Sequence, residues 1–417
     1  MTDSSVVVSD APSDAAALDL DLPVALYPLT YLEEGDEVTV GRVDIDSYCV
    51  LPADGAQVLR QLGSGKTPRE AADWYAATYG ETVNIGEFLE AMQELELIAP
   101  AGEGAPVELK PVRWQRLGQA IFSPIGLVFY VAILALGVLA MIDTPLAAPR
   151  FEHIFVSKYL VVIELVIFVG QIPLVLLHES AHALAGRRLG LNTSLAVGRR
   201  FYFIVFETRM DGLVSVPRGK RYLPMIAGLL TDVLVICSLT FAAVAMGAPY
   251  SDAPFIAQVF LALAFGTLMR AMWQFYFYLQ TDLYYVFVTV LGCNDLQKTS
   301  RKILANRWWR LLGRKDRLYD ESTFHAKDRA VGRWYSWLLV AGYTFSIITL
   351  AIFVIPAMWH LATMVGDIFQ PGTSALRLAD GIAFSVLNIG QFVAAFWLAR
   401  RERRERVRTP ESTLVLD

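Results

Sequence analysis

Six long apolar stretches follow one another along the chain after residue 110, and polar links separate them. Each stretch can form a helix of about 20 residues, the length that crosses the hydrocarbon core of a bilayer. The pattern therefore predicts six membrane-spanning helices, at 120–142, 159–185, 223–246, 255–280, 333–358 and 377–399. The alternative for any single stretch is a buried helix in the core of a large soluble domain.

Basic residues concentrate in alternate links between these stretches. They precede the first stretch, lie between the second and third and between the fourth and fifth, and follow the sixth. The links at 143–158, 247–254 and 359–376 hold few of them. Because positive residues are retained on the cytoplasmic side, we expect a multi-pass protein of a bacterial-type inner membrane with both termini cytoplasmic. The regular alternation also argues against the soluble-core alternative.

Before residue 110 the hydrophobic pattern is that of a small α+β domain. Residues 27–50 alternate in the manner of short strands. Three helices are expected to follow, and the second opens at Thr67, with Glu70 at the spacing of a capping box. The third opens at Asn84. Strands followed by three helices of this size predict a winged-helix domain over residues 24–105.

Composition and charge divide the chain at the same place. It is 55% hydrophobic and 18% charged, whereas soluble globular domains average about 45–50% and 25%. Residues 1–110 carry a net charge of −16, and residues 111–417 carry +11. We therefore predict an acidic disordered leader (1–23), the winged-helix domain, a mostly α-helical six-span domain (111–400) and a basic cytoplasmic tail (401–417).

The acidic charge of the first domain excludes nucleic acid as its partner, because binding phosphates needs Lys and Arg. Its segment Tyr48–Gly55, with Leu59, the helix start at Thr67–Glu70 and Phe88 to Leu95, resembles PqqD-like domains, which recognise ribosomally made, modified peptides. The resemblance implies a peptide or leader-peptide partner that adds a strand at the edge of the wing. A generic winged-helix docking domain is the alternative.

The second apolar stretch contains the motif His178-Glu179-Ser180-Ala181-His182. Two His four residues apart lie on one helix face and can share one Zn²⁺, while the Glu between them can deprotonate a bound water. Ionisable side chains inside a membrane helix are costly unless they have a role. The motif predicts His178 and His182 as zinc ligands and Glu179 as the general base. The alternative is a pair of core histidines that hydrogen-bond to neighbouring helices.

Asp282 is the candidate third ligand, since catalytic zinc takes three protein ligands and an open position. The second and fourth stretches run in the same direction, so Asp282, at the end of the fourth, is expected at the depth of the two His. The alternative interpretation is that Asp282 is a charged residue at the C-terminal end of its helix. By the same reasoning about depth, Glu164 and Arg270 are expected to pair inside the bundle. Pro173 is expected to kink the second helix.

These residues resemble the site-2-protease-like intramembrane zinc metalloproteases, and more closely their subgroup of peptide zinc metalloproteases. The match covers residues 159–300, the expected core of the membrane domain. In that family the third helix opens near an Ala-Gly pair and the fourth carries an Asp; Ala227-Gly228 and Asp282 stand in those places. The chain departs from the family in Asp282-Leu283, where Asp-Gly is common, and in Gly228-Leu229, where Gly-Pro is usual.

The link between the second and third stretches, Thr193–Val216, has the pattern of a β-hairpin. Phe201 to Phe206 is rich in strand-forming residues, and Asp211-Gly212 is a turn signal. In the resembling family such a sheet beside the zinc holds an unwound substrate strand. The alternative is an amphipathic segment that lies on the inner leaflet of the membrane.

Together these patterns predict a membrane-embedded zinc metalloendopeptidase with a cytoplasmic peptide-recognition head. It would cleave a peptide or leader-bearing precursor during the maturation or export of a modified peptide. The first alternative function is a non-catalytic membrane scaffold or export component that binds peptide. The second is a transporter, which is compatible with the in-span Glu164 and Arg270 but leaves the His-Glu-His motif unexplained.

Overall fold

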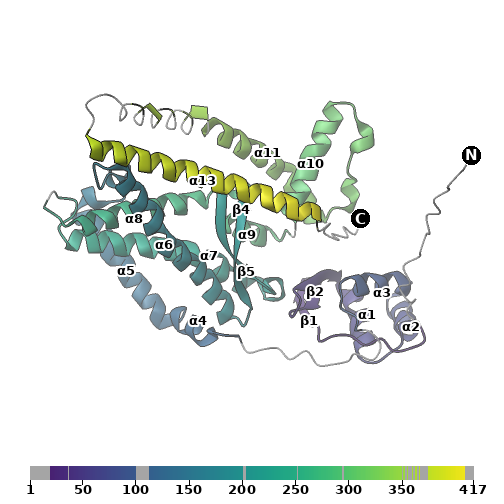
Figure 1. The fold of residues 1–417 in the computed structure, drawn as a ribbon. Helices are drawn as coiled ribbons and strands as arrows, with labels where there is room; N and C mark the ends of the chain where they lie inside the picture. The colour runs from purple at the N-terminus through teal and green to yellow at the C-terminus, as the bar shows by residue number, and fades with distance from the viewer. Residues whose placement is uncertain are drawn as a thin grey trace, which may run out of the picture. The chain divides into compact units, whose positions relative to one another are not determined.

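The computed structural model describes residues 19–35, 37–99, 112–200, 203–250, 252–293, 295–349 and 374–408, with single positions between 351 and 366. Most of the predicted leader and the end of the predicted tail lie outside these residues. The chain divides into two compact units, Met1–Pro111 with Asp211–Pro217, and Val112–Met210 with Arg218–Asp417. The protein is mostly helical, with a small antiparallel sheet in its N-terminal part (Figure 1).

The N-terminal unit has a three-stranded antiparallel sheet followed by three helices. The strands pair in the order β1-β2-β3. Their bounds, with those of the helices, are β1 (Thr30–Glu34), β2 (Glu37–Arg42), β3 (Ser47–Pro52), α1 (Ala53–Gly63), α2 (Pro68–Tyr79) and α3 (Ile85–Glu94). The predicted strands and the predicted three helices are confirmed.

The helix starts in this unit are fixed by the expected caps. The Thr67 hydroxyl accepts a hydrogen bond from the Glu70 N–H at 3.2 Å, and the Glu70 carboxylate accepts one from the Thr67 N–H at 3.0 Å. This reciprocal pair is a capping box. Asn84 caps α3 by accepting from the Glu87 N–H. Sheet and helices share a core of fully buried side chains that includes Val40, Val58, Leu59, Leu62, Leu89 and Leu97.

Four helices of the second unit are long and apolar enough to cross a membrane, among the residues that the structure describes. They are α5 (Pro124–Asp143), α6 (Leu160–Arg188), α7 (Arg218–Ala245) and α8 (Phe255–Trp273). They correspond to the first four predicted stretches and mark the chain as a membrane protein. The remaining α-helices among the described residues of this unit are α4 (Gln115–Ile121), α9 (Asp282–Leu291), α10 (Leu296–Leu311), α11 (Ala326–Thr349) and α13 (Ala375–Arg408).

The last two predicted stretches begin in α11 and α13. The end of the 333–358 stretch falls partly outside the described residues, as do several side chains of 377–399. The start of α13 lies beside the start of α6, because the Asp380 carboxylate accepts hydrogen bonds from the N–H groups of Leu160 and Val161 at 2.9 and 3.0 Å. The two helices therefore begin on the same side of the bundle (Figure 1).

The fourth predicted stretch, 255–280, is wrong as a single helix. Helix α8 ends at Trp273, a one-turn 3₁₀ helix follows (η4, Phe277–Leu279), and α9 begins at Asp282. Gln280 between them has a φ of +56°, in the left-handed region that few non-glycine residues occupy. Asp282 therefore starts a new helix instead of ending an old one, and Arg270 and Asp282 lie on different helices.

The predicted hairpin after α6 is confirmed. Strands β4 (Thr193–Arg200) and β5 (Phe203–Met210) pair antiparallel, with Thr193 opposite Met210 and Arg200 opposite Phe203. The connecting residues 201–202 lie outside the described part of the chain. Asp211-Gly212 forms a turn, as its pattern indicates, with Gly212 at a φ of +79°, but this turn follows β5 and does not join the two strands.

Short 3₁₀ helices complete the described secondary structure. They are η1 (Pro145–Ala147), η2 (Phe151–Ile154), η3 (Leu213–Ser215), η5 (Lys315–Arg317) and η6 (Glu321–Thr323).

Candidate metal centre

The Nε2 atoms of His178 and His182 lie close together, on the same side of α6. They lie one turn apart on α6, so their side chains share a face of the helix. Both rings are buried, and their Nε2 atoms are 3.2 Å apart. The ring centroids are 4.9 Å apart with planes at 69°.

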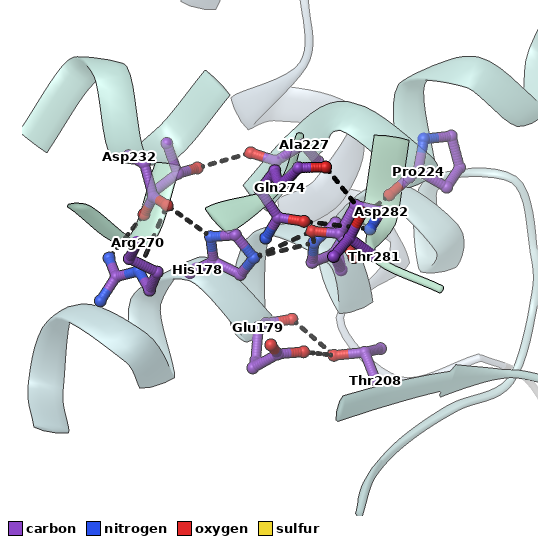
Figure 2. Close-up of polar contacts among 12 residues, drawn as sticks. His178, Glu179, Thr208, Pro224, Ala227, Asp232, Arg270, Gln274, Thr281 and Asp282 are labelled. Atoms are coloured by element: carbon purple, nitrogen blue, oxygen red, sulfur yellow. Dashed lines mark hydrogen bonds and ion pairs between the residues drawn. The ribbon is translucent and has the colours of Figure 1, made fainter. Parts of the chain in front are cut away.

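Asp282 reaches the same place from the first turn of α9 (Figure 2). Its Oδ2 lies 3.2 Å from the Nε2 of His178 and 3.2 Å from the Nε2 of His182. Three ligand atoms at 2.0–2.1 Å from a tetrahedral ion would be about 3.3 Å apart. The structure thus brings together the three residues expected from the sequence, at the spacing that one metal ion requires. Among the described residues, this is the one such group of His, Cys and acidic side chains.

Gln274 holds the backbone that carries Asp282. Its side-chain Oε1 accepts a hydrogen bond from the Asp282 N–H at 3.0 Å, and its backbone carbonyl accepts one from the Thr281 hydroxyl at 2.6 Å. Leu283 is an ordinary helical residue of α9, and the left-handed backbone lies at Gln280. The departure from Asp-Gly to Asp-Leu is therefore compatible with this placement of Asp282.

An oxygen atom lies within 3.1 Å of the second nitrogen of each ring. His182 Nδ1 lies 2.6 Å from the backbone carbonyl oxygen of Pro224, which can only accept, so this nitrogen carries a proton. His178 Nδ1 lies 3.1 Å from Oδ2 of Asp232. In metal-binding histidines such an outer partner fixes the tautomer and the ring orientation. The two Nε2 atoms are thus left with free lone pairs, which can bind a metal ion together with the carboxylate of Asp282.

Asp232 is the main feature of this site that the sequence reasoning missed. It lies on α7 and has no exposed surface. Arg270 on α8 donates to its Oδ1 through Nη2 at 2.5 Å and to its Oδ2 through Nε at 3.2 Å. A usable signal was present, because Asp232 is the one acidic residue in the apolar run 223–246 and an in-span carboxylate needs a partner.

The expected pairing of Glu164 with Arg270 is wrong. Glu164 instead accepts hydrogen bonds from Asn388 and Gln391 of α13, at 3.2 and 3.0 Å. Residue spacing gives the depth of a side chain along its helix, but it does not say which neighbouring helix the side chain faces. Here α7 supplies the carboxylate that Arg270 needs.

Gly228 leaves the room that the two imidazoles occupy. A Cβ atom built on this residue would lie 2.2 Å from Nε2 of His182 and 2.4 Å from Nε2 of His178. Real Cβ atoms do not approach other atoms so closely, so the backbone of α7 can pass the site only with glycine at this position. This gives a physical role to one residue of the Ala227-Gly228 pair.

Glu179 is held by the hairpin. It is buried, and its Oε2 accepts a hydrogen bond from the Thr208 hydroxyl of β5 at 2.8 Å. The same hydroxyl lies 2.9 Å from the Glu179 backbone carbonyl, so its single proton serves one acceptor at a time. Nothing in the sequence pattern singled out Thr208. It connects the sheet to the predicted general base (Figure 2).

The charges of the group favour a divalent cation. The carboxylates of Asp282, Asp232 and Glu179 and the guanidinium of Arg270 leave an excess of two negative charges if both rings are neutral. Protonating both rings would balance them, but it would place two N–H groups 3.2 Å apart and facing each other. A cation of charge +2 balances the charges without this repulsion, and burying unbalanced charge is costly.

Comparisons with protein-family models, with curated proteins and with solved structures found no match for this chain. The functional conclusion therefore depends on the residues of the site and their geometry.

Proposed function

We propose that this chain is a membrane-embedded zinc metalloendopeptidase. The observation that carries the proposal is the triangle of Nε2, Nε2 and Oδ2 atoms, each pair 3.2 Å apart, inside a bundle of apolar helices. Two imidazoles and one carboxylate are a donor set of catalytic zinc sites. Nitrogen donors also argue against Mg²⁺ and Ca²⁺, which prefer oxygen.

His178, His182 and Asp282 would hold the ion. A Zn²⁺ bound there supplies a Lewis acid and a water molecule of lowered pKa. Glu179 accepts the proton of the attacking water and returns it to the amine that leaves when the peptide bond breaks. Thr208 keeps the Glu179 carboxylate in one orientation between these two transfers. These are the roles that the His-Glu-His motif predicts, and the grouping of the three donor atoms supports them.

The proposal includes six spans with both termini in the cytoplasm, α11 and α13 being the fifth and sixth. It is supported by Asp380, which holds the start of α13 beside the start of α6. When six spans cross a membrane in alternating directions, the second and the sixth span start on the same side. His182 is six residues before Arg188, the basic end of α6, a distance of about 9 Å along the helix. Cleavage would then occur near the cytoplasmic face.

The N-terminal unit would recruit the substrate as a winged-helix, PqqD-like domain. Its sheet has the order β1-β2-β3, so β1 and β3 each have one edge without a strand partner among the described residues. An extended peptide can pair with such an edge through its backbone. Cleavage of a leader-bearing precursor during peptide maturation or export is the role that best unites the two units.

Zinc content tests the proposal against the non-catalytic scaffold. The full-length protein purified in detergent is expected to contain one zinc per chain by elemental analysis, and His178→Ala is expected to contain none. His153→Ala is the matched control, because His153 bonds the Leu146 carbonyl and is no member of the group. A wild-type protein without zinc after zinc supplementation would contradict the peptidase and favour the scaffold.

Replacing Thr208 by Val removes the hydroxyl but keeps the shape of the side chain. We expect zinc content to be unchanged and peptide cleavage to slow by about 3- to 10-fold, the equivalent of one hydrogen bond. Thr208→Ser retains the hydroxyl and should cleave at nearly the wild-type rate. A Val variant as active as wild type would show that the hydrogen bond does not matter for Glu179. The assay is cleavage of a quenched-fluorescence peptide library.

A further inference from the structure

We propose that Asp232 and Arg270 are positioning residues of the metal centre. The carboxylate fixes the ring of His178, and the guanidinium fixes the orientation of that carboxylate. This inference rests on the proposed function, because it concerns how His178 binds Zn²⁺. Neither residue touches the reacting atoms, so both would act through His178.

The two oxygens of the Asp232 carboxylate contact two different side chains, those of His178 and Arg270. Oδ2 lies 3.1 Å from His178 Nδ1, and Oδ1 accepts the 2.5 Å hydrogen bond from Arg270. Arg270 also reaches Oδ2 through Nε at 3.2 Å. A planar guanidinium that contacts both oxygens of a carboxylate fixes its orientation as well as its charge. The plane of the Asp232 carboxylate, and hence its approach to the imidazole, is therefore set by Arg270.

Arg270 is itself tied to α6. Its Nη1 donates to the Gln171 side-chain carbonyl at 3.0 Å, and its Nη2 lies 3.4 Å from the Leu174 backbone carbonyl. Gln171 in turn donates to the Leu263 carbonyl of α8 at 3.0 Å. The chain of contacts thus runs through α6, α7 and α8, and it returns to the helix that carries His178.

The two imidazoles have different outer partners, and the inference rests on this difference. His182 donates to a neutral backbone carbonyl, that of Pro224. His178 lies beside the carboxylate of Asp232, and a carboxylate partner makes an imidazole a more basic and better oriented ligand. Because Arg270 offsets the charge of Asp232, this carboxylate adds no net charge to the apolar bundle. His178 is the ligand whose affinity for the metal should depend on the outer pair.

A purely structural ion pair is the competing explanation, and a double variant separates the two. Replacing a buried ion pair by apolar residues of similar volume is often neutral or stabilising for the fold. Asp232→Leu combined with Arg270→Met should therefore leave the metal-free protein as stable to heat as wild type. If the pair positions His178, the same variant should still lose zinc affinity.

The experiment compares four full-length proteins in detergent: wild type, Asp232→Asn, the double variant and Asp380→Asn. Zinc affinity is measured by competition with a chelator, and thermal unfolding is measured after metal removal. We expect both Asp232 variants to bind zinc about 10- to 100-fold more weakly. Asp380→Asn is the matched control, since Asp380 also hydrogen-bonds α6, but 18 residues before His178; its zinc affinity should equal that of wild type.

Cobalt substitution gives a measurement that should not change if the Asp232–Arg270 pair were purely structural. At saturating Co²⁺ the visible absorption bands report the ligand field, and we expect them to shift in Asp232→Asn but not in Asp380→Asn. Wild-type zinc affinity and cobalt bands in a folded Asp232→Asn protein would overturn the positioning role while the peptidase proposal stands. A wild-type protein that binds neither metal would overturn both.

Discussion

Changing Glu179 to Gln is expected to slow peptide cleavage by about 10²- to 10⁴-fold, the usual contribution of a general base. The amide keeps the shape of the side chain and can still accept from the Thr208 hydroxyl, whose oxygen lies 2.8 Å from the carboxylate. It cannot take up a proton from water at neutral pH. Because Glu179 is not one of the three grouped donors, zinc content should stay at one ion per chain.

Glu207→Gln is the matched control for this change. Glu207 precedes Thr208 on β5, so its side chain points to the opposite face of the hairpin, where it lies 3.6 Å from Arg209. Its replacement should leave both cleavage and zinc content unchanged. If Glu179→Gln cleaved the peptide library at the wild-type rate, Glu179 would not be the base. If the Glu179→Gln and Glu207→Gln proteins both held zinc and neither of them cleaved any peptide, a metal-binding scaffold would be the better description.

Changing Gly228 to Ala is expected to abolish stoichiometric zinc binding through a single added carbon. That carbon would lie within 2.4 Å of the Nε2 atoms of both His178 and His182, so the rings or α7 must move apart. Elsewhere in a helix the same change stabilises by about 0.5–1 kcal/mol. The loss would therefore come from the site and not from helix propensity. Elemental analysis of the purified protein and cleavage of the peptide library both measure it.

Gly219→Ala provides the comparison on the same helix. A Cβ atom at Gly219 meets no atom within 4 Å, so this variant should retain zinc and unfold at an unchanged or higher temperature. Retention of one zinc per chain by Gly228→Ala would show that α7 does not pass the two His in the way described. It would also remove the basis for placing Asp232 against His178.

Features set by local sequence were predictable, and those set by packing between helices were not. The capping box at Thr67 and the His178-Glu179-His182 face of α6 follow from residue spacing alone. The depth of Asp282 was predictable because α6 and the fourth stretch run in the same direction. The partner of Arg270 was not, since a helical repeat does not say which neighbouring helix supplies the carboxylate.

The break before α9 was hidden by the apolar character of residues 274–281. Hydropathy does not distinguish an apolar helix from an apolar turn whose polar backbone groups are satisfied by side chains. Gln274 and Thr281 make such hydrogen bonds here. Thr208 was equally hidden, because a single hydroxyl on a strand gives no periodic signal.

The same break makes the metal group depend on parts of the chain that follow it. Inside a bilayer, irregular backbone is tolerated only where protein or water satisfies its polar groups. The Tyr278 carbonyl accepts from Gln297 of α10 at 3.1 Å, and the Phe277 carbonyl accepts from the Tyr335 hydroxyl of α11 at 3.2 Å. A fragment truncated at residue 300 would lack Tyr335. The smallest piece that keeps the metal group in this arrangement therefore extends through α11, beyond residue 300.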